Sequence, residues 1–467
     1  KRLYRTHELL FLRRDRMSQQ LADKTNDLDF LSSLVKKAEK GGADAADAVL
    51  FESMSLEVSY RLGKREDLER SESKDLGLRI FLGQKQAIVS STDITASSLD
   101  ELLERGLSMA AAMPDDPYCG LADTDHLSKN YPDLDLNEDH EPAPEALYDL
   151  AAKAEEAALA VDGVSNSESA GAGWNRNRIA LVTSGGFTGT YATSSHSIFA
   201  SVIAGEGTAM ERDYDFSSAR HTADLDAPEK IGKNAGEQAV KRLRPRKVES
   251  QEVPVLFDQR VSRSILGHFS NAISGTSIAR GTSFLKDSLD TAVFKPDIVI
   301  VDDPHRPRGL ASKPFDGEGV TNQKWLLVNQ GLLTTWVLDS ASARQLKLRT
   351  TGHASRGTSG PPAPNTTNLY MQPGDQSPEE LIGGIDNGLY ITELIGFGVN
   401  GVTGDYSRGA AGFWIEKGEL AYPVSELTIA GNLRDMFLET TPANDLVFRY
   451  GSNAPTLRID GLMVAGT

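Results

Sequence analysis

The sequence contains a single cysteine, Cys119. One thiol cannot form a disulfide within the chain, and it cannot supply a zinc or iron–sulfur site built from several thiolates. Scarcity of cysteine is typical of proteins from reducing compartments, so we expect a cytoplasmic protein. Cys119 itself lies in a Pro-Tyr-Cys-Gly segment, where we expect an inert loop thiol.

Long hydrophobic runs are also missing. The longest apolar stretches, such as the one within 297–302, have the length of a strand, whereas a membrane-spanning helix needs about 20 apolar residues. Positive charge is scarce, because 49 Lys and Arg stand against 66 Asp and Glu, for a formal charge of −17. That balance argues against a surface built to neutralise phosphates. We therefore expect neither a membrane nor a nucleic acid among the partners.

The local signatures of catalysis are absent as well. No two of the eight histidines lie two to four residues apart, so no single helix offers two imidazoles to one metal ion. No G-x-S-x-G or Walker A pattern occurs. The segment Gly396–Gly401 matches G-x-G-x-x-G, but glycine-rich sequence follows it instead of a helix, so we expect a turn between strands. His268 is expected to be a helical residue satisfied by a polar partner.

The first half of the chain mixes helical and strand patterns. Apolar residues at helical spacing predict four helices: 27–40, 98–113 with Ser97 or Ser98 as its cap, 145–161, and one that begins at Asp226 or Pro228 and ends before Pro245. Alternating or turn-bounded apolar residues predict strands: 55–62, a hairpin of 76–82 and 86–89, 163–172, 177–192 and 196–205. The acidic, proline-rich segment 115–144 between them is predicted to be a long surface loop.

The second half has a different pattern. Short apolar runs alternate with Gly, Asn and Pro turns and predict strands: 255–257, 298–301, 325–328, 334–338 and 413–415. Helices are predicted only over 260–274 and 378–384. The basic run 241–247 lies between the two patterns and is predicted to mark a domain boundary.

These patterns predict an α+β protein of two domains. The N-terminal domain, 17–245, would mix helices with an antiparallel sheet, and the C-terminal domain, 246–467, would be rich in β-structure. The basic residues 1–16 are interpreted as an upstream extension that precedes a natural start at Met17.

One acidic turn could carry chemistry. Phe315-Asp-Gly-Glu-Gly319 is predicted to be a tight turn that displays Asp316 and Glu318. Two carboxylates serve acid–base catalysis only when the fold holds them at a defined separation, so a purely structural role is the alternative.

Several motifs, dispersed along the chain, occur together in one known protein family. In the second half they are 278–284 (IARGTSF), 315–319 (FDGEG), 388–393 (GLYITE), 409–418 (GAAGFWIEKG) and 455–459 (PTLRI). In the first half, 77–83 (GLRIFLG) followed by 90–93 (SSTD) is similar to that family's N-terminal hairpin. In this order the motifs resemble the TldD/PmbA (TldD/TldE) metallopeptidase family, and the resemblance spans Met17 to Thr467.

The zinc-binding motif of the family is degenerate here. In the TldD branch an H-E-x-x-x-H helix binds zinc and activates water. Counted back from Arg280, the three positions hold Leu266, Gly267 and Asn271. Leucine cannot ligate a metal and glycine cannot act as a base, and the second half also lacks the expected cysteine ligand. The resemblance therefore implies the PmbA (TldE) branch, with no catalytic or metal-binding residue in this chain and zinc in a partner subunit.

The resemblance implies a bacterial, cytoplasmic partner of a zinc-bearing TldD-like subunit. Such a heterodimer acts on unstructured peptides, in peptide maturation and in proteolysis, and the peptide could add to a sheet edge of the β-rich domain. Candidate peptide contacts are Arg280, Thr282 and Ser283 after the degenerate helix, together with Asp316 and Glu318. A homodimer of the isolated chain stays open.

Two other functions stay open. One is a regulator that acts without proteolysis, of the DNA gyrase modulator type. The other is an independent, zinc-free hydrolase whose serine or carboxylate is assembled by the fold.

Overall fold

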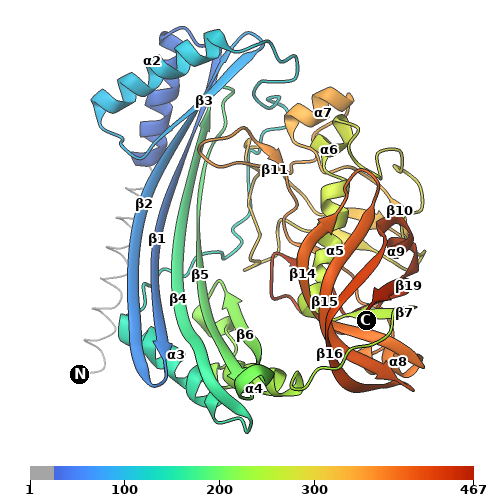
Figure 1. Ribbon diagram of the computed structural model, residues 1–467. Helices are drawn as coiled ribbons and strands as arrows, with labels where there is room; N and C mark the ends of the chain where they lie inside the picture. Colours follow the sequence, from blue (N-terminus) through green and yellow to red (C-terminus); the bar gives the residue numbers. More distant parts are fainter. Residues whose placement is uncertain (1–25, 467) are drawn as a thin grey trace, which may run out of the picture.

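The computed structural model describes residues 26–466. The predicted extension 1–16 and the start at Met17 lie outside these residues. Figure 1 shows a long curved sheet formed by the first half of the chain, facing a β-rich second half. The predicted α+β class, with a mixed N-terminal part and a β-rich C-terminal part, is confirmed, whereas the division at residue 245 stays a prediction.

The N-terminal part is built on one six-stranded antiparallel sheet of order β3-β2-β1-β4-β5-β6. Its strands are β1 (Ala45–Arg61), β2 (Lys64–Leu82), β3 (Lys85–Ser91), β4 (Val164–Thr183), β5 (Thr188–Ala204) and β6 (Glu211–Ala219). The predicted hairpin is confirmed, because Leu82 of β2 pairs with Lys85 of β3.

Helices cover both ends of this sheet. A helix over residues 26–40 and α2 (Ala96–Ala112) pack at one end, and α3 (Pro144–Leu159) and α4 (Pro228–Lys241) at the other (Figure 1). Helices α3 and α4 approach closely through glycine and alanine: a Cβ at Gly232 would overlap the carbonyl oxygen of Ala154. All four predicted helices are confirmed. The cap of α2 was predicted wrongly, since Thr95 holds that position and the Ser98 hydroxyl donates to Asp93 at 2.6 Å.

The strand predictions after residue 163 were partly wrong. Three strands were expected, over 163–172, 177–192 and 196–205, but the chain forms two long ones, β4 and β5, and then the unpredicted β6. The break predicted after residue 172 is absent, because the polar stretch 175–178 in the middle of β4 continues to pair with β1 and β5. Polar residues do not interrupt a strand whose face lies toward water, because the ladder is made by the backbone. The predicted loop 115–144 is confirmed.

The C-terminal part contains a closed barrel of order β16-β15-β14-β7-β19-β17, in which β16 also pairs with β19. The strands are β7 (Gln251–Phe257), β14 (Asn387–Val399), β15 (Asp405–Glu416), β16 (Glu419–Asn432), β17 (Thr440–Pro442) and β19 (Leu457–Ala465). The segment 396–401 forms the end of β14 and the turn into β15, as predicted. The main core lies between the barrel strands and α5 (Gln259–Ala272).

Smaller elements surround the barrel. They are a sheet of β8 (Ile300–Asp302), β9 (Trp325–Asn329), β10 (Leu332–Leu333), β13 (Leu369–Met371) and β18 (Ser452–Asn453), a pair of β11 (Ala354–Ser355) and β12 (Ala363–Pro364), and helices α6 (Gly275–Ala279), α7 (Ser340–Leu346), α8 (Pro378–Gly383) and α9 (Leu433–Glu439). The strand predicted over 334–338 is not formed, because only Val337 makes an isolated bridge, to Ser274.

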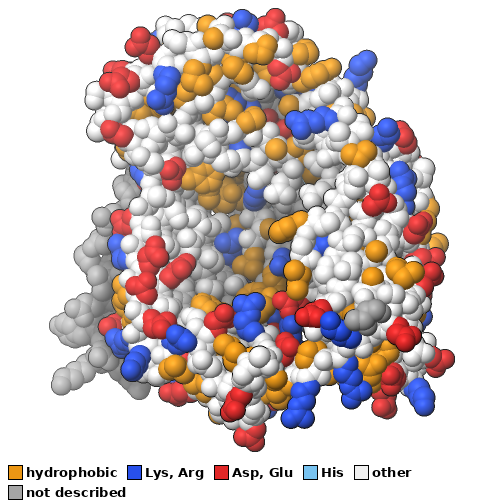
Figure 2. All heavy atoms as spheres, in the orientation of Figure 1, with side chains coloured by type: hydrophobic (Ala, Val, Ile, Leu, Met, Phe, Trp, Pro, Cys, Tyr) orange, Lys and Arg blue, Asp and Glu red, His pale blue; other side chains and the backbone are white. Residues whose placement is uncertain are grey.

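The two parts meet at several places, of which two junctions flank the hollow that Figure 2 shows between them. At the upper junction, Arg356 pairs with Asp47 of β1, and Phe315 packs edge-on against Phe187. At the lower junction, Arg260 of α5 pairs with Asp213 of β6. No helix within residues 26–466 is long and apolar enough to cross a membrane.

Candidate functional site

Helix α5 carries the positions where zinc-binding relatives would have their motif. It begins after Asp258, whose carboxylate accepts a hydrogen bond from the backbone N–H of Arg260 at 2.8 Å. Its apolar face, Val261, Ile265, Leu266 and Phe269, is buried in the main core. The helix is therefore held from one side, and its other side faces the lower junction.

The three motif positions do not converge on one point. Leu266 is fully buried in the core, at 0% exposure, and the side chain of Asn271 is exposed. Gly267 opens into free space, because a Cβ placed on it would meet no atom within 4 Å. Leu266, Gly267 and Asn271 thus offer no set of metal ligands.

A cavity of about 560 Å³, which we call the Gly267 cavity, opens beside this glycine. It lies between β6 and the end of α4 on one side and α5, β14 and β15 on the other. Charged residues dominate its lining: Arg212, Asp213, Arg242, Arg260, Arg263, Glu393 and Arg408.

Two of these arginines are engaged with the carboxylates of the cavity. The Asp213 carboxylate accepts hydrogen bonds from Arg260 at 2.7 Å and from Arg242 at 3.3 Å, and Arg242 also pairs with Glu393. Burial disfavours the charged form of Arg260, but the Asp213 charge together with the hydrogen bonds to Asp213 and Tyr214 outweighs it, so the pKa of that guanidinium is raised. These four residues form a network that joins the two parts of the chain.

Arg263 and Arg408 are held without a carboxylate. The guanidinium of Arg263 lies over the ring of Tyr450, 4.2 Å from its centre, and Nε of Arg408 donates to the carbonyl oxygen of Ile395 at 3.3 Å. Neither side chain forms an ion pair with any residue of 26–466. The cavity therefore keeps two positive charges that the described chain does not neutralise.

His268 lies behind the cavity. Its ring meets that of Tyr406 edge-on, with 5.7 Å between the ring centres. Burial lowers the pKa of His268 to about 4, and the nearby Arg408 charge acts in the same direction, so the ring is neutral near pH 7. The sequence predicted a polar partner for His268. That prediction is wrong for the ring nitrogen Nε2, which is buried and has no hydrogen-bond partner within the described residues.

A second, larger cavity of about 1120 Å³ adjoins the lower junction. Within it, the hydroxyl of Tyr390 donates to Asp258 at 2.6 Å, and burial followed by the Asp258 charge raises the pKa of Tyr390. Thr392 lines both cavities, and its Oγ1 is buried without a hydrogen-bond partner in residues 26–466. Thr392 thus marks the passage between the two spaces.

Beside Thr392 the barrel has an open strand edge. β14 pairs with β7 only over Leu389–Ile391, and from Thr392 to Val399 no described strand pairs with it on that side. An unpaired edge offers backbone N–H and C=O groups to an extended chain.

The edge of β6 in the other part is blocked instead. Arg260 and Arg449 donate to its carbonyl oxygens at Tyr214 and Phe216. On β14 the corresponding stretch has one such contact, from Arg408 to the carbonyl oxygen of Ile395, and no strand partner on the side of β7.

The loop residues proposed from sequence lie elsewhere. Arg280 and Thr282 are exposed after α6, and Ser283 is buried, with its hydroxyl donating to the carbonyl of Ala272 at 2.5 Å. Ser283 thereby secures the end of α5. None of the three lines the Gly267 cavity.

The prediction that the acidic turn displays its carboxylates was wrong, because Asp316 and Glu318 are each only 3% exposed. Asp316 accepts the backbone N–H groups of Glu318 and Val320 through Oδ1 and that of Ala354 through Oδ2, at 2.8–3.1 Å.

These buried carboxylates organise the second half of the chain where it meets the long sheet, because their hydrogen bonds go to backbone N–H groups of that half. Glu318 accepts the N–H of Ser340 at 2.9 Å. Burial, and then the Glu318 charge, raise the pKa of Asp316 to about 8, and burial also raises that of Glu318. No hydrogen bond or ion pair in the described chain joins this pair to the loop 280–283.

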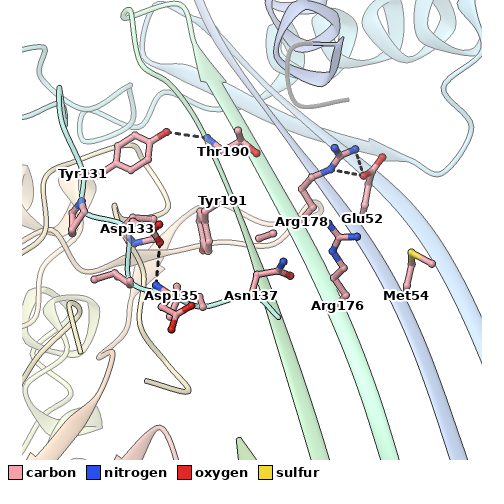
Figure 3. Close-up of a pocket in the computed structure, with 15 residues that line it drawn as sticks. Glu52, Met54, Tyr131, Asp133, Asp135, Asn137, Arg176, Arg178, Thr190 and Tyr191 are labelled. Atoms are coloured by element: carbon pink, nitrogen blue, oxygen red, sulfur yellow. Dashed lines mark hydrogen bonds and ion pairs between the residues drawn. The ribbon is translucent and has the colours of Figure 1, made fainter. Parts of the chain in front are cut away.

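A third cavity, of about 540 Å³, lies against the middle of the long sheet (Figure 3). Its charges are paired: Nε of Arg178 donates to Glu52 at 2.7 Å, and Arg176 lies 3.7 Å from Asp139. The N–H of Thr190 donates to the hydroxyl of Tyr131, which closes one end. This cavity is polar and its cations are already satisfied.

One group of three side chains in the described residues could hold a cation. It comprises Asp123, Asp125 and His126 in the long loop, with both aspartates exposed. Exposed acidic groups of this kind are common without an ion, and this one lies on a different segment from α5.

Comparison with known proteins decides the family. Three family models match, described as PmbA/TldA metallopeptidase domain 1 over residues 46–110, the central domain over 137–243 and the C-terminal domain over 250–466. The chain belongs to the PmbA/TldD metallopeptidase family. It is 37% identical to Metalloprotease PmbA of Escherichia coli O157:H7 over 430 residues, which covers 91% of this chain and 93% of that protein. A PmbA homolog of Haemophilus influenzae is also 37% identical, over 93% of this chain and 95% of its own length.

Solved structures agree on the fold. A Bacteroides thetaiotaomicron protein whose structure carries the name of a DNA gyrase modulator superposes with a TM-score of 0.86 at 25% identity, over 94% of this chain and 98% of that one. TldE from Thermococcus kodakarensis superposes with a TM-score of 0.84 at 20% identity, over 94% of this chain and all of that one. The resemblance inferred from dispersed motifs is thereby confirmed.

Sequence reasoning missed the Gly267 cavity within this PmbA/TldD fold. The sequence could have indicated Arg263, because it precedes Gly267 by four residues and so shares its helix face. It could not have indicated Arg408 and Thr392, which reach the same space only because β14 and β15 pack on α5.

Proposed function

We propose that this chain is the non-catalytic subunit of a PmbA/TldD-type zinc metallopeptidase, paired with a zinc-bearing, TldD-like subunit. The observation that carries the proposal is the state of α5. The first ligand position holds Leu266, buried in the core, and the position of the base holds Gly267, which has no side chain. Zinc, a base and activated water would come from the partner.

Its task in the complex is to bind an unstructured peptide and to complete the chamber. The open edge of β14 from Thr392 to Val399 supports this, because pairing through backbone hydrogen bonds requires little particular sequence. The hollow between the two parts of the chain, visible in Figure 2, lies beside that edge and gives an extended peptide access.

Reconstitution tests the proposal. The purified chain should contain no stoichiometric zinc by elemental mass spectrometry, should cleave no unstructured peptide alone, and should support cleavage when mixed with a TldD-like subunit from the same bacterium. Stoichiometric zinc together with peptidase activity in the lone chain would overturn it. Chelator-resistant cleavage by the lone chain would favour the zinc-free hydrolase.

Assembly and location follow from the same proposal. Native mass analysis of the complex from cells should show one copy of this chain with one TldD-like subunit, and a homodimer only when the chain is isolated. A single cysteine supports a reducing, cytoplasmic setting.

A non-proteolytic regulator is the second candidate, because one structural relative bears the name of a DNA gyrase modulator. Affinity capture distinguishes the two: a topoisomerase recovered without a zinc-bearing relative would favour regulation.

A further inference from the structure

The Gly267 cavity has an excess of positive charge. Five arginines line it, against the two carboxylates Asp213 and Glu393. Both carboxylates are engaged by Arg242 and Arg260, and Arg212 is paired outside the cavity with Glu168 at 3.4 Å. Arg263 and Arg408 remain, in a chain whose formal charge is −17. These two cations border the cavity, where their free N–H groups can reach an anionic ligand.

Both arginines are positioned for a ligand. Stacking on Tyr450 orients the guanidinium of Arg263 without using its N–H groups. Arg408 spends one donor on the carbonyl of Ile395 and keeps the others. Gly267 leaves the space beside Arg263 open, since nothing lies within 4 Å of the place a Cβ would take.

A third polar group lies in the same lining. The hydroxyl of Thr392 is buried and has no partner within residues 26–466, although buried hydroxyls are normally hydrogen-bonded. Thr392 is also the first residue of the open β14 edge. The cavity and the edge are therefore parts of one continuous surface.

We propose that the Gly267 cavity binds a carboxylate of the peptide, held between Arg263 and Arg408, while the peptide backbone pairs with β14. This inference rests on the proposed peptide-binding function and adds a specificity for acidic peptides. Planar guanidinium groups match carboxylates in geometry, and such charge-assisted hydrogen bonds are the stronger kind. The net negative charge of the chain disfavours a long polyanion, whereas a single carboxylate meets only the local arginines.

The carboxylate has two sources, a Glu or Asp side chain or the peptide's C-terminus. One labelled, unstructured peptide sequence in four versions separates them: an internal Glu or Gln, each with a free or an amidated C-terminus. Binding to the full chain is measured by fluorescence anisotropy at low salt. We expect the peptide with the recognised carboxylate to bind about tenfold more tightly than its neutral counterpart.

Arginine variants locate the effect. Arg263→Gln and Arg408→Gln should each abolish the preference while leaving the affinity for the neutral peptide unchanged. Arg212→Gln is the matched control, because Arg212 lines the same cavity but is paired with Glu168, and it should keep the preference.

The outcomes separate this inference from the proposed function. Equal affinity of the wild-type chain for all four peptides would overturn the carboxylate site and leave peptide binding intact. Failure to bind any of them would overturn both. A preference that persists in the folded Arg263→Gln and Arg408→Gln variants would also contradict it. If a variant fails to fold, the affinities of the wild-type chain for the four peptides still test the carboxylate site.

Discussion

The upper and lower junctions join the same two parts of the chain with the same kinds of residues, but in different ways. At the upper junction Asp47 lies between Arg79 at 2.8 Å and Arg356 at 2.5 Å, and all three side chains are at most 4% exposed. At the lower junction the side chains of Arg242 and Arg260 are 14% and 16% exposed beside a cavity, and two further arginines lack an ion-pair partner in residues 26–466.

The difference separates charges that hold the fold from charges available to a ligand. A buried ion pair is costly to disturb, because removal of one member leaves the other desolvated and alone. A charge at a cavity with free donors costs little to remove and can bind an anion. Four variants test this contrast, from the largest expected loss of stability to the smallest.

Asp47→Ala should have the largest effect. It leaves two buried guanidinium groups without their carboxylate, so the free energy of unfolding should fall by about 3–5 kcal/mol. Urea denaturation measures it. The matched control is Asp100→Ala, which removes the exposed pair with Lys37 and should cost less than about 1 kcal/mol. Similar losses in the two variants would contradict a structural role for the upper junction.

Glu318→Gln should change how stability depends on pH. The pKa of Asp316 is raised to about 8 in the folded chain from 3.8, so the folded state binds a proton that the unfolded state releases, and stability falls as pH rises through this range. Glu318→Gln removes the second cause of the raised pKa of Asp316, after burial, and also removes the raised titration of Glu318 itself, so the fall should flatten.

Melting temperatures between pH 6.5 and 8 measure the combined titration of Asp316 and Glu318. Histidines with lowered pKa values, such as His268, stabilise the fold increasingly as pH rises from about 4 to 6.5 and contribute no further change above that range. Parallel curves for the wild type and Glu318→Gln in this window would argue against the proton on Asp316.

Arg242→Gln should weaken the lower junction moderately. It removes charged hydrogen bonds to Asp213 and Glu393, but these groups border a cavity that water can enter, so we expect a loss of about 1–2 kcal/mol in urea denaturation. A loss as large as that of Asp47→Ala would erase the distinction between the junctions.

Arg263→Gln should have the smallest effect on stability, within about 0.5 kcal/mol, because the side chain is exposed and has no ion pair in the described chain. Its expected effect is on binding of acidic peptides alone. A large loss of stability in thermal denaturation would show that Arg263 holds the fold instead of a ligand.

Much of the fold could be predicted where local signals agree. The helix over residues 26–40, α2, α3, α4 and α5 follow from apolar spacing together with proline or glycine boundaries. Prediction failed where the neighbouring strands decide whether a segment forms a strand. The polar middle of β4 stays in the ladder because β1 and β5 flank it, and 334–338 forms no strand because it lacks a neighbour to pair with.

The sequence by itself determined what three positions offer: leucine, glycine and asparagine at 266, 267 and 271 supply no imidazole ligands and no carboxylate base. Only the tertiary structure decided what takes their place. Arg263 and Arg408 are 145 positions apart and line one cavity because β15 pairs with β14 over α5, while Asp316 and Glu318 became part of a junction because the long sheet covers them. Such contacts depend on which elements pack together, and no local pattern encodes that choice.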